Sequence, residues 1–131
     1  MKKTMEFLKE AGVFYLATAE GDQPRVRPFG AVAEFDGKLY IITSNKKDVY
    51  NQIAKNPKVE VSAMNDKGQW IRLTATLVRD ERRAAKTAML EANPDLRRMY
   101  SEDDGIMEVL YFEKATAAIC SFTSAPEIYN F

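Results

Sequence analysis

Histidine is absent from the 131 residues of this sequence. Its absence excludes Ser-His-Asp and Cys-His catalytic arrangements, histidine-ligated zinc and a histidine-bound haem. It also removes the side chain that most often transfers protons near neutral pH. If the protein is an enzyme, we therefore expect a cofactor to carry the reaction.

Cysteine, long apolar runs and an excess of charge are also lacking. The single cysteine, Cys120, excludes an intramolecular disulfide, and no segment has the length and apolar character of a membrane helix or the core of a signal peptide. The 19 basic side chains are balanced by 19 acidic ones, so no overall field attracts nucleic acid or an anionic membrane. We expect a cytoplasmic protein in which a local cluster holds any phosphate-bearing ligand.

What remains is the pattern of a small, strand-rich domain. The composition, 46% hydrophobic and 29% charged, is that of a globular protein, and the length predicts one domain over residues 1–131. Spacing and stop signals predict helices over 4–11, 48–55 and 81–92, the last capped by Asp80. Hairpin signals such as Asp36-Gly37 predict strands over 13–19, 25–35, 38–43, 59–63 and 69–78, with a further strand or two in 108–122.

This order of elements predicts a mainly β fold. About six strands joined by hairpins, with helices at three separated places, favour an antiparallel sheet or barrel with peripheral helices. A doubly wound α/β fold is disfavoured because strands and helices do not alternate, and no glycine-rich dinucleotide fingerprint follows a strand.

The first stretch that could carry chemistry is Arg25-Val26-Arg27-Pro28-Phe29-Gly30. Alternate residues of a strand share a face, so Arg25 and Arg27 project together and suit bidentate capture of a phosphate. Pro28 and Gly30 indicate a sheet edge, a bulge or a close approach of a ligand to the backbone. The alternative is a solvated strand face on which Pro28 only marks an edge.

The second stretch, Thr43-Ser44-Asn45-Lys46-Lys47-Asp48, joins a strand end to a helix start. Its hydroxyls, two ammonium groups, free backbone N–H groups and the positive end of the helix dipole all favour an anion. The alternative is a helix capped by Asn45 or Asp48, with both lysines in water. Because both stretches flank the Asp36-Gly37 hairpin, they lie at opposite ends of paired strands unless the register or a bend brings them together.

Trp70 and Arg72 form a third candidate. They share one face of a strand, while Ile71 and Leu73 face the other way and are expected in the core. That leaves the tryptophan and the arginine facing water, a ligand or a partner subunit. A tryptophan buried at a dimer interface is the structural alternative, and it is compatible with a ligand site there.

Taken in order, these segments resemble the pyridoxamine 5'-phosphate oxidase-like flavoproteins, above all the short branch of nitroimidazole-resistance-type proteins. The resemblance covers nearly the whole chain. Its strength lies in the order and spacing of several modest motifs, at residues 24–30, 37–40, 43–50, 56–59, 70–72, 93–94 and 108–112.

The resemblance implies a six-stranded antiparallel split β-barrel that forms a homodimer, with two flavin mononucleotide (FMN) sites at the subunit interface. Residues 25–30 would run along the isoalloxazine ring, and the loop 43–47 with its following helix would serve the ribityl chain and the phosphate. Trp70 and Arg72 would come from the other subunit or the site rim. Arg27 and Lys47 would hold the phosphate, and the full set of implied cofactor-binding residues is Arg25, Arg27, Pro28, Phe29, Gly30, Thr43, Ser44, Asn45, Lys46, Lys47, Asn51, Trp70 and Arg72.

The sequence departs from the family in two respects. An ungapped alignment from Asn56-Pro57 puts Asp48 and Val49 where the oxidase has a basic pair, so Lys46 and Lys47 must act from earlier positions. The chain also lacks the oxidase's C-terminal substrate segment with its arginine and histidine, so oxidation of pyridoxamine phosphate is not expected.

The activity implied by the resemblance is flavin-mediated electron transfer. Electrons would pass from a reduced nicotinamide donor to a small acceptor such as a quinone or a nitroaromatic, with no side chain assigned as proton donor. The alternatives are a non-catalytic flavin-binding store or sensor, and a deazaflavin-dependent reductase.

Overall fold

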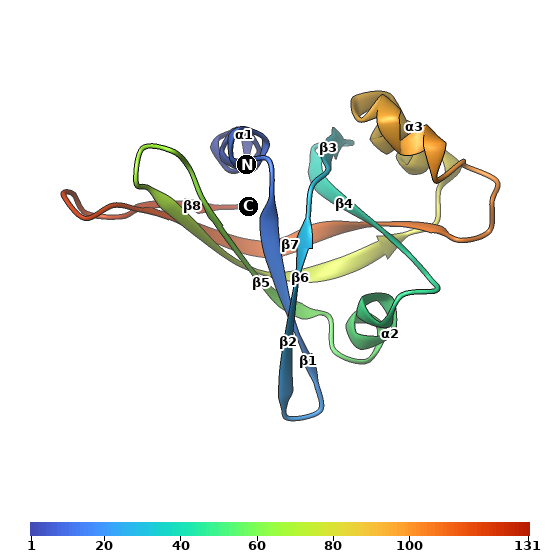
Figure 1. Cartoon of the computed structure of the whole chain (residues 1–131), viewed down its shortest axis with the longest axis horizontal. Helices are drawn as coiled ribbons and strands as arrows, with labels where there is room; N and C mark the ends of the chain where they lie inside the picture. Colours follow the sequence, from blue (N-terminus) through green and yellow to red (C-terminus); the bar gives the residue numbers. More distant parts are fainter.

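The computed structural model describes all residues, 1–131, as a long antiparallel sheet with helices around it (Figure 1). The helices are α1 (Lys2–Ala11), α2 (Asp48–Lys55) and α3 (Arg83–Ala92), and a 3-10 helix, η1 (Pro94–Arg98), follows α3. The strands are β1 (Phe14–Glu20), β2 (Gln23–Phe29), β3 (Val32–Phe35), β4 (Lys38–Ser44), β5 (Lys58–Met64), β6 (Trp70–Asp80), β7 (Met107–Cys120) and β8 (Glu127–Asn130). None of the helices is both long and apolar enough to span a bilayer.

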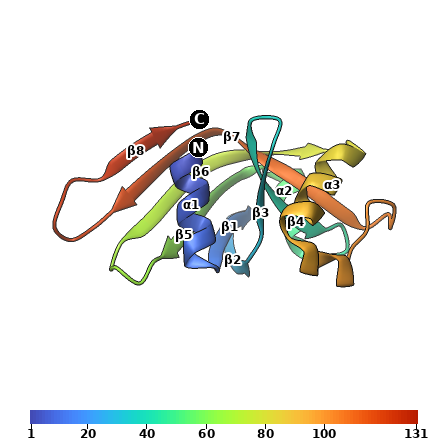
Figure 2. The ribbon, with the colours of Figure 1, turned by 90° about the horizontal axis from the view of Figure 1, so that it is seen from above.

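The strand order is β2-β1-β5-β6-β7-β4-β3, with β8 paired to β7, and every pairing is antiparallel. The two ends of this order, β2 and β3, are consecutive in the chain but do not pair with each other. The sheet therefore coils without closing, as Figure 2 shows from above. This confirms the mainly β, antiparallel fold that the order of elements predicts and the split barrel that the family resemblance implies.

The strand count differs from the expected six because residues 25–35 do not form one strand. β2 pairs with β1, whereas β3 pairs with β4, and Gly30 and Ala31 lie between them without strand pairing. Pro28 has no N–H to extend a ladder, so the chain leaves one part of the sheet and joins another here. The eighth strand, β8, comes from the C-terminal residues.

β7 changes partners along its length, which bends the sheet. Residues 107–111 pair with β4, while residues 116–119 pair with β8. Between them, Lys114 has φ 52°, and the β6–β7 register shifts between Thr74 and Thr76. An extra residue in one strand of a pair increases its twist and bends it.

The helices cover different parts of the core. The main cluster takes apolar side chains from α1 and α2 and from the inner sheet face, among them Phe7, Leu8, Leu16, Val49, Ile53, Ile71 and Leu73. A smaller cluster lies under α3 and includes Tyr40, Ala85, Met89, Leu90 and Val109. Figure 1 shows α2 beside the β1–β2 hairpin, with α3 at the opposite end of β4.

Local stop signals set most helix ends. Gly12 ends α1 with φ 80°, and α2 has the predicted bounds 48–55, since Asn56-Pro57 cannot continue it. The expected start of α3 at Glu81 is wrong, because the helix begins at Arg83 and its N-cap, Arg82, makes no side-chain capping bond. Asp80 instead accepts a 3.0 Å hydrogen bond from the backbone N–H of Arg82, so it holds the turn before the helix.

Candidate functional site

Two adjoining clefts lie between β2, the start of α2 and the segment after α3. The apolar cleft has a volume of about 600 Å³, and its walls are Pro28, Phe29, Gly30, Ala31, Ile42, Thr43, Lys47 and Val49 on one side and Ala92, Asn93, Pro94, Asp95, Leu96, Met99 and Tyr100 on the other. The cationic cleft, about 470 Å³, is lined by Glu20, Arg25, Val26, Arg27, Lys47, Asp48, Val49 and Gln52. Lys47 and Val49 line both clefts, so the two are contiguous.

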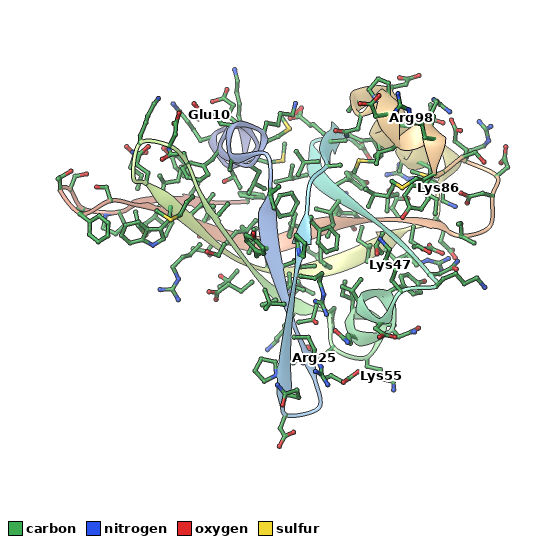
Figure 3. The ribbon with its side chains drawn as sticks, viewed as in Figure 1. Glu10, Arg25, Lys47, Lys55, Lys86 and Arg98 are labelled. Carbon is green, nitrogen blue, oxygen red and sulfur yellow. The ribbon has the colours of Figure 1, made fainter.

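The break between β2 and β3 brings the two candidate stretches together. β2 turns away from the β3–β4 hairpin at Gly30, and its end therefore lines the apolar cleft on the same side as Thr43 and Lys47. Figure 3 shows Arg25 on β2 and Lys47 at the start of α2, with Lys55 at the other end of that helix. A bend, and not the hairpin register, produces this arrangement.

Arg27 is the half-buried cation of the cationic cleft. Its Nη1 donates to Thr18 Oγ1 (2.7 Å) and to the Leu16 carbonyl oxygen (3.3 Å), and its Nη2 donates to Gln52 Oε1 (2.5 Å). All three acceptors are neutral. Burial, followed by the nearby charge of Arg25, lowers the pKa of Arg27 below its ordinary value.

Arg25 shares the same cleft but has a carboxylate partner. Its Nε and Nη2 donate to Glu20 Oε1 at 3.2 and 3.0 Å, and both side chains are half exposed. The hydrogen bonds and charge of Arg25 lower the pKa of Glu20, which is ionised at neutral pH. Arg25 is therefore largely neutralised, whereas Arg27 is not.

Lys47 is the N-cap residue of α2, and Asp48 stands in the first turn. The Lys47 side chain is exposed and makes no ion pair with a carboxylate of the chain. Thr43, 2% exposed, lines the apolar cleft at the end of β4. The cleft is thus bounded by an uncompensated ammonium group, a hydroxyl and the start of a helix, where an anion is favoured.

The other residues of this loop lie outside the two clefts. Asn45 Nδ2 donates to the Gly105 carbonyl oxygen (2.9 Å) and to Glu108 Oε2 (3.0 Å), which ties the loop to the start of β7. Ser44 is buried, and its Oγ accepts a 3.1 Å hydrogen bond from the backbone N–H of Lys46. The Lys46 side chain is exposed and lines neither cleft.

Asn51 lines a third, polar cleft of about 360 Å³, together with Ala19, Glu20, Gly21, Gln52, Lys55 and Asn56. This polar cleft adjoins the cationic cleft, since Glu20 and Gln52 line both. The carboxylate of Glu20 therefore stands between the basic residues and the polar cleft.

Trp70 and Arg72 lie outside all three clefts of their own chain. Arg72 pairs with Glu60 at 3.5 Å, and the Trp70 ring packs on Phe122 with centroids 5.0 Å apart. Cross-strand pairing runs from Arg72 through Ser62 and Tyr15 to Pro28, so these residues share the outer face of the sheet. A contribution of Trp70 and Arg72 to the site of a second subunit stays a prediction.

Two parts of the site were not predicted from the sequence. They are the second wall of the apolar cleft and Gln52, which lines both the cationic and the polar cleft. The wall comes from the end of α3 and η1, where Asn93-Pro94 signals only a helix stop. Gln52 is a polar residue on the inner face of α2, 6% exposed. The signal was the spacing of Gln52 from Val49 and Ile53, which puts an amide on the buried face of a helix.

The comparisons with known proteins identify the family and the fold of this chain. The model of the pyridoxamine 5'-phosphate oxidase family matches residues 1–111. The crystal structure of a NimC/NimA family protein from Clostridium acetobutylicum is 60% identical, with a TM-score of 0.96, and the match covers 100% of this chain and 93% of that one. No curated protein sequence matches this chain.

Two more distant structures share the fold. A haem-binding protein from Mycobacterium smegmatis is 16% identical, with a TM-score of 0.72 over 94% of this chain and 57% of that one. A FAD-binding protein from Mesorhizobium loti is 17% identical, with a TM-score of 0.64 over 92% and 94%. The family model and the 60% identical structure show that the chain belongs to the pyridoxamine 5'-phosphate oxidase family, in its NimC/NimA branch.

Proposed function

We propose that this protein binds FMN in the two contiguous clefts and acts as an oxidoreductase-type flavoprotein. The observation that carries the proposal is the state of Arg27. Its guanidinium is half-buried, has only neutral acceptors, and its Nε makes no hydrogen bond. An arginine has five N–H donors, so donors remain for a bidentate contact with a phosphate.

The remaining lining suits the rest of the cofactor. Pro28, Phe29, Ile42 and Val49 give the apolar cleft a surface for a planar ring, next to the exposed backbone at Gly30. Lys47 lies at the junction of the clefts, where it can reach an anion held by Arg27. The FAD-binding protein from Mesorhizobium loti supports the proposal that this fold accommodates a flavin.

Glu20 supplies the one carboxylate of the polar cleft, which Lys55 also lines, and we propose that this carboxylate favours a monophosphate over a dinucleotide. Its carboxylate stands where the cationic cleft meets the polar cleft, held by Arg25 and by a 3.3 Å hydrogen bond from Gln52 Nε2. A second phosphate that extends toward the polar cleft would meet this negative charge. FMN places no phosphate there.

When bound, a flavin would supply the redox chemistry between a reduced nicotinamide donor and a small acceptor such as a quinone or a nitroaromatic. The protein's residues anchor the phosphate and orient the ring. The part of the apolar cleft lined by Pro94, Leu96, Met99 and Tyr100 would offer an apolar surface to a small aromatic acceptor.

We also propose a homodimer whose interface is the outer face of the sheet. This face exposes large apolar side chains, namely Tyr15, Val26, Met64, Phe122 and Ile128, each at least half exposed. Several large apolar side chains exposed on one face, with the Arg72–Glu60 ion pair among them, favour an interaction site there. Tyr15 pairs across the sheet with Pro28 at the rim of the apolar cleft, so a second copy on this face would meet the flavin site.

The visible spectrum of the purified protein tests the proposal. We expect the absorption bands of a flavin, either as purified or after addition of FMN. Bleaching by a reduced nicotinamide and recovery on addition of a nitroaromatic or a quinone would support the enzyme over a storage protein. A colourless protein that takes up no added FMN would overturn the proposal.

A further inference from the structure

Gln52 connects the cation of the cationic cleft to its carboxylate. Its side chain is 6% exposed on the inner face of α2. Its Oε1 accepts hydrogen bonds from Arg27 Nη2 (2.5 Å) and from Thr18 Oγ1 (2.6 Å), while its Nε2 donates to Glu20 Oε2 (3.3 Å). The amide therefore stands between a guanidinium and a carboxylate that would otherwise attract each other.

Only a neutral side chain with both an acceptor and a donor can stand in this place. An amide supplies a carbonyl oxygen for Arg27 and an NH₂ group for Glu20. A carboxylate at position 52 would pair with Arg27 directly and would repel Glu20. An apolar side chain of similar length would leave Nη2 of the half-buried Arg27 and the buried Thr18 hydroxyl without this acceptor, which is costly.

The hydrogen bonds also set the orientation of Arg27. The oxygens of Thr18, Leu16 and Gln52 accept from the two terminal nitrogens, Nη1 and Nη2, and leave Nε without a partner. A phosphate binds bidentately to two parallel N–H groups of a guanidinium. Neutral acceptors hold the group at its terminal nitrogens and no carboxylate pairs with it; the Asp48 carboxylate of the same cleft acts on its charge only from a distance.

We infer that Gln52 is the positioning residue of the anion site: it fixes Arg27 for a phosphate and keeps the Glu20 carboxylate from neutralising it. The identity of the ligand rests on the proposed function, whereas the role of Gln52 rests on the contacts around Arg27. A phosphate monoester is the ligand class that this site takes.

The test compares FMN with riboflavin, which has the same ring but no phosphate. Apo protein is titrated with each flavin and binding is followed by quenching of flavin fluorescence, in the wild type and in Gln52→Glu and Gln52→Met. We expect Gln52→Glu to weaken FMN binding at least about tenfold, since charged hydrogen bonds are lost and a repulsive carboxylate is gained. Gln52→Met should weaken FMN binding by about three- to tenfold, and riboflavin affinity should change less than about twofold in both variants.

Gln69→Glu is the matched control, because it makes the same change of an amide to a carboxylate in the β5–β6 turn, outside all three clefts, where a carboxylate oxygen can still accept the hydrogen bond from Asn65 Nδ2. It should leave both affinities within about twofold of the wild type. An equal loss of FMN and riboflavin affinity in both Gln52 variants would show a merely structural role and overturn the inference. So would unchanged FMN binding by Gln52→Glu.

Inorganic phosphate separates this inference from the proposed function. Its binding to the apo protein is followed by amide chemical shifts of residues around Arg27. If the wild type binds phosphate but neither flavin, the proposed cofactor is wrong. In that case, weaker phosphate binding by Gln52→Glu than by the wild type would still support the role of Gln52. Phosphate binding that Gln52→Glu leaves unchanged would refute it.

Discussion

The hydroxyl of Tyr40 donates a 2.6 Å hydrogen bond to Asp80 Oδ2, and both side chains are buried. The same carboxylate accepts from the guanidinium of Arg82 at 2.8 Å, so β4, the end of β6 and the start of α3 are joined at one point. Burial and the hydrogen bond to Asp80 raise the pKa of Tyr40 to about 12. The hydrogen bonds from Arg82 and Tyr40 hold the pKa of Asp80 far below its ordinary value of 3.8.

These shifts predict how stability depends on pH. Tyr40 ionises at about 10 in the unfolded chain but at about 12 in the folded one, so its contribution is complete below pH 10 and is lost as the pH rises toward 12. The Asp80 contribution is complete above its unfolded pKa and is lost as the pH falls below about 4. Urea unfolding of the wild type and of Tyr40→Phe at pH 7 and pH 11 measures the first effect.

In Tyr40→Phe, Asp80 keeps its bonds to Arg82, so we expect a loss of about 1–3 kcal/mol in the free energy of unfolding at pH 7. The further loss between pH 7 and pH 11 should be smaller in this variant than in the wild type. An equal alkaline loss in both proteins would contradict the assignment to Tyr40.

Arg27 should contribute more to FMN affinity than Arg25. Arg27→Ala removes an uncompensated cation, and we expect a loss of about 1.5–3 kcal/mol in the binding free energy of FMN with riboflavin unaffected. Arg25→Ala should cost less, because Glu20 already pairs with Arg25. Flavin titrations of both variants show which arginine contributes more to FMN affinity, and circular dichroism verifies that both variants fold.

Lys47 and Lys46 offer a comparison within one loop. Lys47 lines both clefts, whereas Lys46 lines neither. We expect Lys47→Ala to weaken FMN binding by about tenfold, through loss of a charge-assisted contact with the phosphate, and Lys46→Ala to weaken it less. Raising the salt concentration should reduce the difference in FMN affinity between the two variants, because salt screens the charge of Lys47. A larger loss of FMN affinity in Lys46→Ala than in Lys47→Ala would assign the phosphate contact to Lys46.

Glu20 should control the choice between FMN and FAD. Glu20→Gln removes the carboxylate at the junction of the cationic and polar clefts, so the affinity for FAD relative to FMN should rise by about three- to tenfold at low salt. Glu10→Gln is the matched control, since Glu10 lies on α1, far from Arg25 (Figure 3). An unchanged FAD to FMN ratio in Glu20→Gln would show that the polar cleft does not receive the second phosphate.

The outer face of the sheet should hold the dimer together. Tyr15→Arg places a charge in the middle of this face, and we expect a shift from dimer to monomer in analytical ultracentrifugation. Glu6→Arg changes an exposed residue of α1, which packs on the opposite face of the sheet, and should leave the mass unchanged. A wild-type protein that sediments as a monomer would refute the homodimer.

Local signals in the sequence predicted the elements that depend on a few neighbouring residues. The turn at Asp36 and Gly37 has φ values of 53° and 71°, as a tight hairpin requires, and α2 has its predicted ends. The family resemblance added the split barrel. Both candidate anion stretches could be named from charge and spacing, but their position around the same two clefts could not, since it depends on which strand β2 pairs with.

The sequence by itself determined that the protein has no histidine chemistry, a mainly β fold and two local clusters of cations. These follow from composition and from periodicity over a few residues. Only the tertiary structure decided that Arg27 is uncompensated while Arg25 is paired, that Lys47 and not Lys46 lines the clefts, and that Gln52 stands between Arg27 and Glu20. Such relations join residues up to 32 positions apart, through strand pairings that no local pattern encodes.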